Sequence, residues 1–93
     1  MNPDKVIFTD HALEKGREIG FSEKKLRNLL GGTERLKINF WREAHKLLKY
    51  GLKQNNVAYY YRKGSSKYPP LLFTIEEGET PVVITVTLKK GKV

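Results

Sequence analysis

The chain has 93 residues, a formal net charge of +8 and no cysteine. This length supports one domain with one modest core. The absence of cysteine excludes a disulfide-stapled secreted domain, a thiolate metal site and a cysteine nucleophile. No apolar run approaches the ~20 residues needed to cross a bilayer, and the first residues lack the apolar core of a signal peptide. We therefore expect a single cytoplasmic domain with no membrane partner.

The positive charge is concentrated in the middle of the chain. Residues 32–63 hold eight Lys and Arg against two acidic residues, whereas the segments on either side are close to balanced. Such a block is typical of a solvated surface, but a basic surface also attracts polyanions from a distance. The charge distribution makes nucleic acid a candidate partner.

Two helices are predicted in the first third of the chain. Thr9 is a good N-cap for the first helix, and Gly20 is placed to end it. Gly16 costs about 1 kcal/mol inside a helix, so we expect another group to pass close to it. Ser22 opens a second helix, which ends at Gly31-Gly32 and carries an apolar stripe of Leu26, Leu29 and Leu30.

The segment 33–53 fits two patterns. Leu36, Phe40 and Ala44 recur at helical spacing, whereas Leu48, Tyr50 and Leu52 alternate with polar residues as in a strand. We expect an irregular or partly helical stretch to about His45, followed by a strand over 46–53. The sequence does not decide whether residues 34–50 form a helix or a strand.

Three further strands are predicted from β-branched and aromatic runs, over 57–63, 71–76 and 82–88. Turn-forming residues separate them at 54–56, 64–70 and 77–81. The predicted fold is α+β, with two N-terminal helices packed on one face of a four-stranded antiparallel sheet.

Strand alternation then predicts which side chains lie under the helices. We expect the inward set to be Leu48, Tyr50, Leu52, Val57, Tyr59, Tyr61, Leu71, Phe73, Ile75, Val82, Ile84, Val86 and Leu88. The outward set on an open face would include Lys49, Lys53, Tyr60, Arg62, Thr74, Thr85 and Thr87. A register slip of one residue in the strand 57–63 would exchange its two sets.

The chemistry available is metal-free acid–base chemistry. Two histidines without cysteine give no recognisable zinc signature, and no motif predicts a metal or cofactor. RNA cleavage needs neither, because RNA supplies its own 2′-hydroxyl nucleophile to a base, an acid and a cation. The candidate catalytic residues from this reasoning are His11, His45, Tyr60 and Arg62, with Lys46, Lys49, Lys53 and Thr87 as RNA contacts.

The segments 8–12 (Phe-Thr-Asp-His-Ala), 17–22 (Arg-Glu-Ile-Gly-Phe-Ser) and 83–87 (Val-Ile-Thr-Val-Thr) resemble a family of short prokaryotic proteins. That family is similar in fold to the RelE, ParE and BrnT toxins of the barnase–colicin–RelE ribonuclease-like group. His11 and Thr85 match its motifs, so the resemblance implies catalytic roles for both. Lys15 and Ile19 depart from it, since the family has arginine at both positions.

Three functions follow as hypotheses. The resemblance implies a RelE-like, toxin-type, metal-independent endoribonuclease, held in check by an acidic antitoxin protein. The same basic face would also suit a non-catalytic RNA-binding module that stacks bases on Tyr60. A domain that binds an acidic protein partner is the third.

Overall fold

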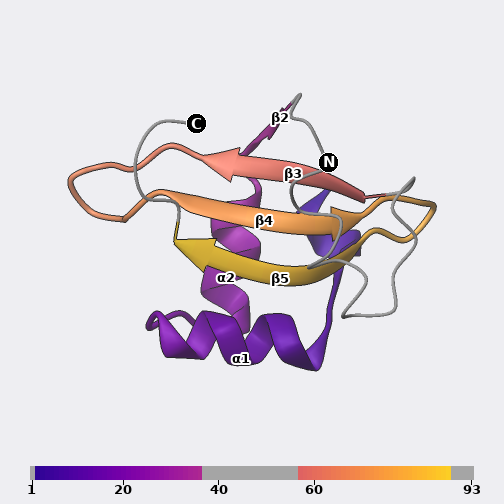
Figure 1. The fold of residues 1–93 in the computed structure, drawn as a ribbon, viewed down its shortest axis with the longest axis horizontal. Coiled ribbons are helices and arrows are strands. Elements are labelled where there is room, and N and C mark those ends of the chain that lie inside the picture. Colours follow the sequence, from indigo (N-terminus) through magenta and orange to yellow (C-terminus); the bar gives the residue numbers. More distant parts are fainter. Residues whose placement is uncertain (1, 37–56, 89–93) are drawn as a thin grey trace.

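The computed structural model describes residues 2–36 and 57–88. Within them the chain forms two α-helices and a five-stranded sheet, so the predicted α+β class is confirmed (Figure 1). The elements in chain order are the 3-10 turn η1 (Pro3–Lys5), β1 (Ile7–Phe8), α1 (Asp10–Glu18), α2 (Glu23–Leu30), β2 (Glu34–Leu36), β3 (Val57–Arg62), β4 (Leu71–Glu76) and β5 (Val82–Leu88). Neither helix in these two ranges is long and apolar enough to cross a membrane.

Both helices begin and end at the positions that their capping residues indicate in the sequence. The Thr9 hydroxyl accepts a hydrogen bond from the Ala12 backbone N–H at 3.0 Å, and Ser22 does the same for Lys25 at 3.3 Å. Gly20 has a φ of 91°, a left-handed conformation that glycine adopts at little cost, and it reverses the chain after α1.

Gly16 is a glycine because of helix packing. It is fully inside α1 and buried, and a Cβ at this position would collide with the side chain of Leu26 on α2. The expected close approach is confirmed, and its physical basis is the contact between the two helices.

The sheet has the strand order β1-β5-β4-β3-β2. The prediction of four antiparallel strands was wrong, because β1 pairs with β5 in parallel and β2 pairs with β3. Strands of two and three residues are too short to produce a readable alternation, so periodicity could not reveal them. β2 lies where an irregular or partly helical stretch was expected, while the strand expected over 46–53 lies outside the described residues.

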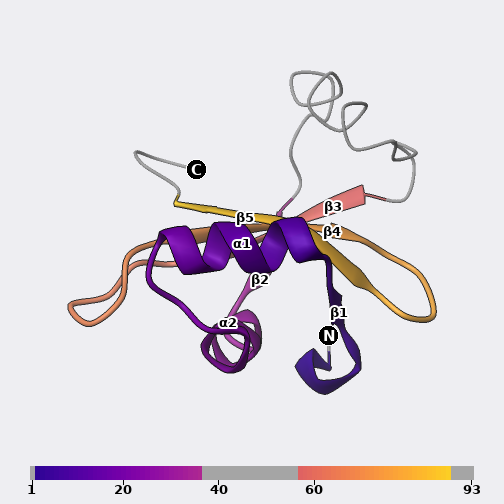
Figure 2. The same ribbon diagram turned by 90° about the horizontal axis from the view of Figure 1, so that it is seen from below.

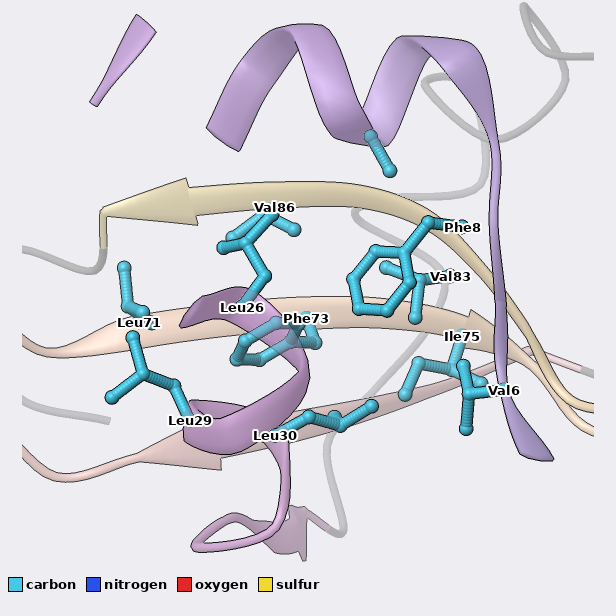
Figure 3. Close-up of a cluster of buried hydrophobic side chains, with 11 residues drawn as sticks. Val6, Phe8, Leu26, Leu29, Leu30, Leu71, Phe73, Ile75, Val83 and Val86 are labelled. Atoms are coloured by element: carbon cyan, nitrogen blue, oxygen red, sulfur yellow. The ribbon is translucent and has the colours of Figure 1, made fainter. Parts of the chain in front are cut away.

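α2 covers one face of the sheet, here called the helix face, whereas α1 runs beside the β5 edge (Figure 2). The prediction that both helices pack on one face was therefore wrong for α1. Leu26, Leu29 and Leu30 of α2 pack there against Leu71, Phe73 and Ile75 of β4 (Figure 3). The predicted inward sides of α2 and β4 are therefore confirmed. Burial of these side chains is the main stabilising contribution, at roughly 1.5–3 kcal/mol each.

The faces of β5 were predicted only in part, because its register shifts. Thr74 pairs with Thr85 but Ile75 pairs with Val83, so Ile84 is an extra residue in β5. Val83 consequently joins the core with Val86, whereas Ile84 packs with Val57 in a second cluster. The Thr9 backbone N–H and hydroxyl donate to the carbonyls of Val83 and Ile84, which ties the start of α1 to this bulge.

The faces of β3 are the reverse of those predicted. Tyr60 pairs with Phe73 and packs against the main core, and Arg62 pairs with Leu71. Both side chains therefore belong to the helix face, and Tyr59 and Tyr61 to the opposite face. The sequence left open a register slip of one residue in this strand, and the structure has the slipped register.

The opposite face is not uniformly open. Val57, Tyr59, Thr74 and Ile84 are each at most 5% exposed, although α2 lies on the other side. Leu88, which was expected inside, is 39% exposed. The predicted solvent-facing surface is thus limited, within the described residues, to positions such as Thr87.

Candidate nucleic-acid interface

The structure separates the predicted catalytic residues that it describes. Tyr60 and Arg62 lie on the helix face, whereas Thr85 pairs with Thr74 and belongs with Thr87 to the opposite face. His11 is partly buried in the first turn of α1. The remaining predicted residues lie outside the described ranges: His45, Lys46, Lys49 and Lys53. The single open face that was expected to carry both Tyr60 and Thr85 does not exist.

Tyr60 instead forms a closed polar group with Arg35 and Glu77, here called the Glu77 corner. The Tyr60 hydroxyl donates to Glu77 Oε2 at 2.6 Å. Arg35 donates to the same carboxylate from Nη2 at 3.0 Å and from Nε at 3.2 Å. The guanidinium therefore holds the carboxylate in a forked arrangement.

The electrostatics of the Glu77 corner keep every member in its ordinary protonation state. Burial, together with the hydrogen bond to Glu77, raises the pKa of Tyr60 to about 12. The hydrogen bond from Arg35 is the largest cause that lowers the pKa of Glu77. Tyr60 thus retains its proton, and its hydroxyl is already hydrogen-bonded to Glu77, which argues for a structural role.

A different arrangement surrounds Tyr68. The Lys25 ammonium lies over the Tyr68 ring, 4.4 Å from its centroid, and donates a hydrogen bond to its hydroxyl. Lys67 Nζ is 5.6 Å and Arg62 Cζ is 5.8 Å from the same centroid. We call these four residues the Tyr68 cluster. Three cations therefore meet at one aromatic ring, within the range of cation–π attraction.

Three separate segments bring the cluster together. Lys25 comes from the first turn of α2, Arg62 from the end of β3, and Lys67 and Tyr68 from the β3–β4 loop, which bends toward the helix side (Figure 2). Inside the loop, the Ser65 hydroxyl accepts hydrogen bonds from the backbone of Lys67 at 3.3 Å and Tyr68 at 3.1 Å. Tyr68 also packs against the main core, so the loop is anchored at both the backbone and the ring.

What distinguishes the cations of the cluster is that three of them gather at one ring and that, among the described residues, none is paired with a carboxylate. Lys15, Arg27 and Arg35 each form a salt bridge, with Glu18, Glu23 and Glu77 respectively. Over residues 2–36 and 57–88, no carboxylate forms a salt bridge with Lys25, Arg62 or Lys67. Positive charges gathered around one ring repel one another, so a bound anion would lower their electrostatic energy.

The charge also changes Tyr68 itself. The hydrogen bond from Lys25 is the largest cause that lowers the pKa of Tyr68, and the charges of Lys25 and Lys67 act in the same direction. Tyr68 and Tyr60 are therefore shifted in opposite directions. The surroundings of Tyr68 stabilise the phenolate form relative to a free tyrosine, and those of Tyr60 destabilise it.

Arg62 has hydrogen-bonding capacity to spare. Its Nε is buried without a hydrogen-bond partner among the described residues. Its Nη1 is held close to the end of α2, where a Cβ on Gly32 would come within 2.9 Å of it. The buried unpaired Nε carries an energetic cost, and Arg62 keeps its positive charge next to the Tyr68 ring without a carboxylate partner among the described residues.

Arg62 was selected from the sequence, but on the wrong face, and Lys25, Lys67 and Tyr68 were missed. The available signal is the Lys67-Tyr68 pair ahead of Pro69-Pro70, in a segment whose composition predicts only a loop. In the part of the chain that the structure describes, no three His, Asp or Glu side chains form a group able to hold a metal ion.

Comparison with known proteins adds no assignment. No protein-family model matches the chain, and no curated protein and no solved structure matches it either.

Proposed function

We propose that the protein binds RNA through the Tyr68 cluster. The observation that carries this proposal is the meeting of three cations at one aromatic ring, with no acidic partner among the described residues. Lysine and arginine neutralise phosphates, and a tyrosine ring offers a surface on which a base can stack. The net charge of +8 would attract such a polyanion from a distance.

The test is to measure the affinity of a short RNA oligonucleotide by fluorescence anisotropy as salt increases. On single strands each neutralised phosphate contributes a slope of about −0.7 in log K against log salt, which is roughly a factor of five at 0.1 M salt. Lys67→Ala should therefore weaken binding about fivefold and lower the slope by about 0.7. Lys67 is exposed, so this change should leave folding intact.

Lys15→Ala is the matched control, because it removes the same charge from a lysine that is already paired with Glu18. It should change the affinity far less than Lys67→Ala. Equal losses from the two variants, or an affinity that salt does not change, would contradict the proposal.

A second candidate function is a toxin-type, metal-independent endoribonuclease. The specific observation in its favour is the lowered pKa of Tyr68 beside Lys25 and Lys67. The Tyr68 hydroxyl, which accepts a hydrogen bond from Lys25, would exchange a proton with the RNA 2′-hydroxyl, and the cations would stabilise the charge that develops on the phosphorus oxygens. An acidic antitoxin would then inhibit the protein by covering the same cations in the cytoplasm.

Cleavage is tested by incubating RNA with the protein in the presence of EDTA. Tyr68→Phe removes the hydroxyl but keeps the ring, so it should lower cleavage by about 100-fold or more while leaving RNA affinity nearly unchanged. RNA that stays intact with the wild type while binding persists would leave the non-catalytic RNA-binding module as the function.

A further inference from the structure

A groove lies beside the Tyr68 cluster, where the chain passes from α1 to α2. Its volume is about 470 Å³, and it is lined by Leu13, Arg17, Gly20, Phe21, Ser22 and Glu23. This volume falls within the roughly 300–1,000 Å³ of small-molecule sites. Leu13 and Phe21 supply apolar surface, and Arg17 and Glu23 supply a hydrogen-bond donor and acceptor.

Phe21 joins the groove to the cluster. It lines the groove, and its ring centroid lies 6.3 Å from that of Tyr68 with the planes inclined at 60°. Its backbone N–H donates to the Gly16 carbonyl at 2.8 Å, and its side chain packs against the main core. The ring is therefore held in place before any ligand arrives, which lowers the entropic cost of binding.

We propose that this groove binds one unstacked base of single-stranded RNA, while the neighbouring phosphates lie on Lys25, Arg62 and Lys67. The inference rests on the proposed RNA binding and adds the substrate class and a second contact region. The phosphate region alone would hold any polyanion. The groove adds a requirement for a base that has left its stack.

The chemistry of the two regions favours single strands over a duplex. Bases in a duplex are stacked and paired, so their faces cannot lie against Leu13 and Phe21, whereas single-stranded RNA can turn a base outward. The Arg17 guanidinium lies at the groove, where a base presents acceptors on its edges, and Glu23, whose Oε2 accepts from Arg27, has its second oxygen for a donor of the base. An acidic peptide would satisfy the cations but has nothing to place on the aromatic surface.

The experiment compares four probes with the full chain at one salt concentration. They are a single-stranded RNA oligonucleotide, the same oligonucleotide with abasic residues, the matching RNA duplex and a polyglutamate peptide of equal charge. We expect the intact single strand to bind about tenfold more tightly than the abasic strand, because one stacked base contributes about that factor. The duplex and the peptide should bind no better than the abasic strand.

Phe21→Leu then localises the base. It keeps apolar volume in the groove but removes the ring, so it should lower affinity for the intact strand about tenfold and leave the abasic strand unchanged. Tyr61→Leu is the control, since it removes an aromatic ring from the opposite face of the sheet. A thermal unfolding curve for each variant verifies that it is folded.

The outcomes separate the two proposals. If no probe binds, the proposed RNA binding fails and this inference fails with it. If intact and abasic strands bind equally, or polyglutamate competes as well as RNA, the cluster recognises charge alone and the groove holds no base. If the duplex binds more tightly than the single strand, the substrate class is wrong.

Discussion

Tyr60 and Tyr68 both pack against the main core on the helix face, yet their surroundings have opposite effects on them. At Tyr60 one arginine meets one carboxylate, the charges cancel, and the pKa of the hydroxyl is raised to about 12. At Tyr68 three cations meet without a carboxylate among the described residues, and the pKa is lowered. The charges around Tyr60 are balanced within the protein, whereas the charges around Tyr68 are complementary to an external anion.

The comparison distinguishes a basic residue from an available cation. Arg35 and Lys15 count equally with Lys25 and Lys67 in the net charge, but each of the first two is already paired. Total charge therefore predicts attraction to a polyanion, and the ion pairs decide where on the surface it binds.

Removing two unpaired cations of the Tyr68 cluster, compared with removing two paired cations elsewhere, should give the largest difference. Lys25→Ala/Lys67→Ala should weaken RNA binding roughly 25-fold at 0.1 M salt and lower the salt slope by about 1.4, because two phosphate contacts are lost. Lys15→Ala/Arg35→Ala changes the net charge equally but removes paired cations. Anisotropy titrations measure the RNA affinity of both folded variants. Equal losses of affinity would show that pairing with a carboxylate does not decide which cations bind RNA.

Removing the hydroxyl of Tyr60 or of Tyr68 should show which of the two stabilises the fold. Tyr60→Phe removes the donor to Glu77, so it should lower the free energy of unfolding by about 1.5 kcal/mol, as for a hydrogen bond to a charged group. Thermal unfolding would detect this, because 1 kcal/mol shifts the Tm of a chain of this size by roughly 4–8 °C. Tyr68→Phe is the matched control and should lower the free energy of unfolding less, because water can replace the hydroxyl that accepts from Lys25. A larger loss from Tyr68→Phe would show that the hydroxyl of Tyr68 is structural.

Acid should abolish the contribution of the Glu77 corner. The folded protein holds the pKa of Glu77 below its usual value of 4.5, so this group stabilises the fold above that pH and ceases to as pH falls through the folded pKa. Glu77→Gln should cost about 1 kcal/mol at pH 7, since the pair is partly exposed. Urea unfolding from pH 7 to pH 3 should show the two proteins converging in acid. A difference that stays constant with pH would mean that the carboxylate charge is irrelevant.

Much of the fold could be predicted because its signals are local. Thr9, Ser22 and Gly20 set the limits of the helices through capping chemistry that involves only neighbouring residues. The runs that became β4 and β5 gave the bounds of both strands correctly.

The candidate site could not be predicted, because it depends on two features that are not local. The register of β3 decides whether Arg62 or Tyr61 faces the helices, and alternation fits both choices until β3 is paired with β4. The extra residue Ile84 reverses the alternation inside β5 in the same way. Because Arg62 lies on the helix face, its guanidinium is close to the ring of Tyr68, which Lys25 also contacts. Lys25 is far from the other two in the sequence, so the sequence gave no reason to group the three residues.

The smallest effect should come from two adjacent glycines at the end of α2. A Cβ on Gly32 would lie 2.9 Å from Arg62 Nη1, whereas on Gly31 its nearest neighbour would be the Asn28 carbonyl at 3.4 Å. Gly32→Ala should therefore move the guanidinium without unfolding the protein, because the end of a flexible side chain can yield. RNA affinity should fall by less than the roughly fivefold contribution of one whole phosphate contact. Gly31→Ala is the matched control and should leave affinity unchanged. If Gly32→Ala binds as the wild type does, the position of Arg62 is not critical, and Lys25 and Lys67 hold the phosphates without it.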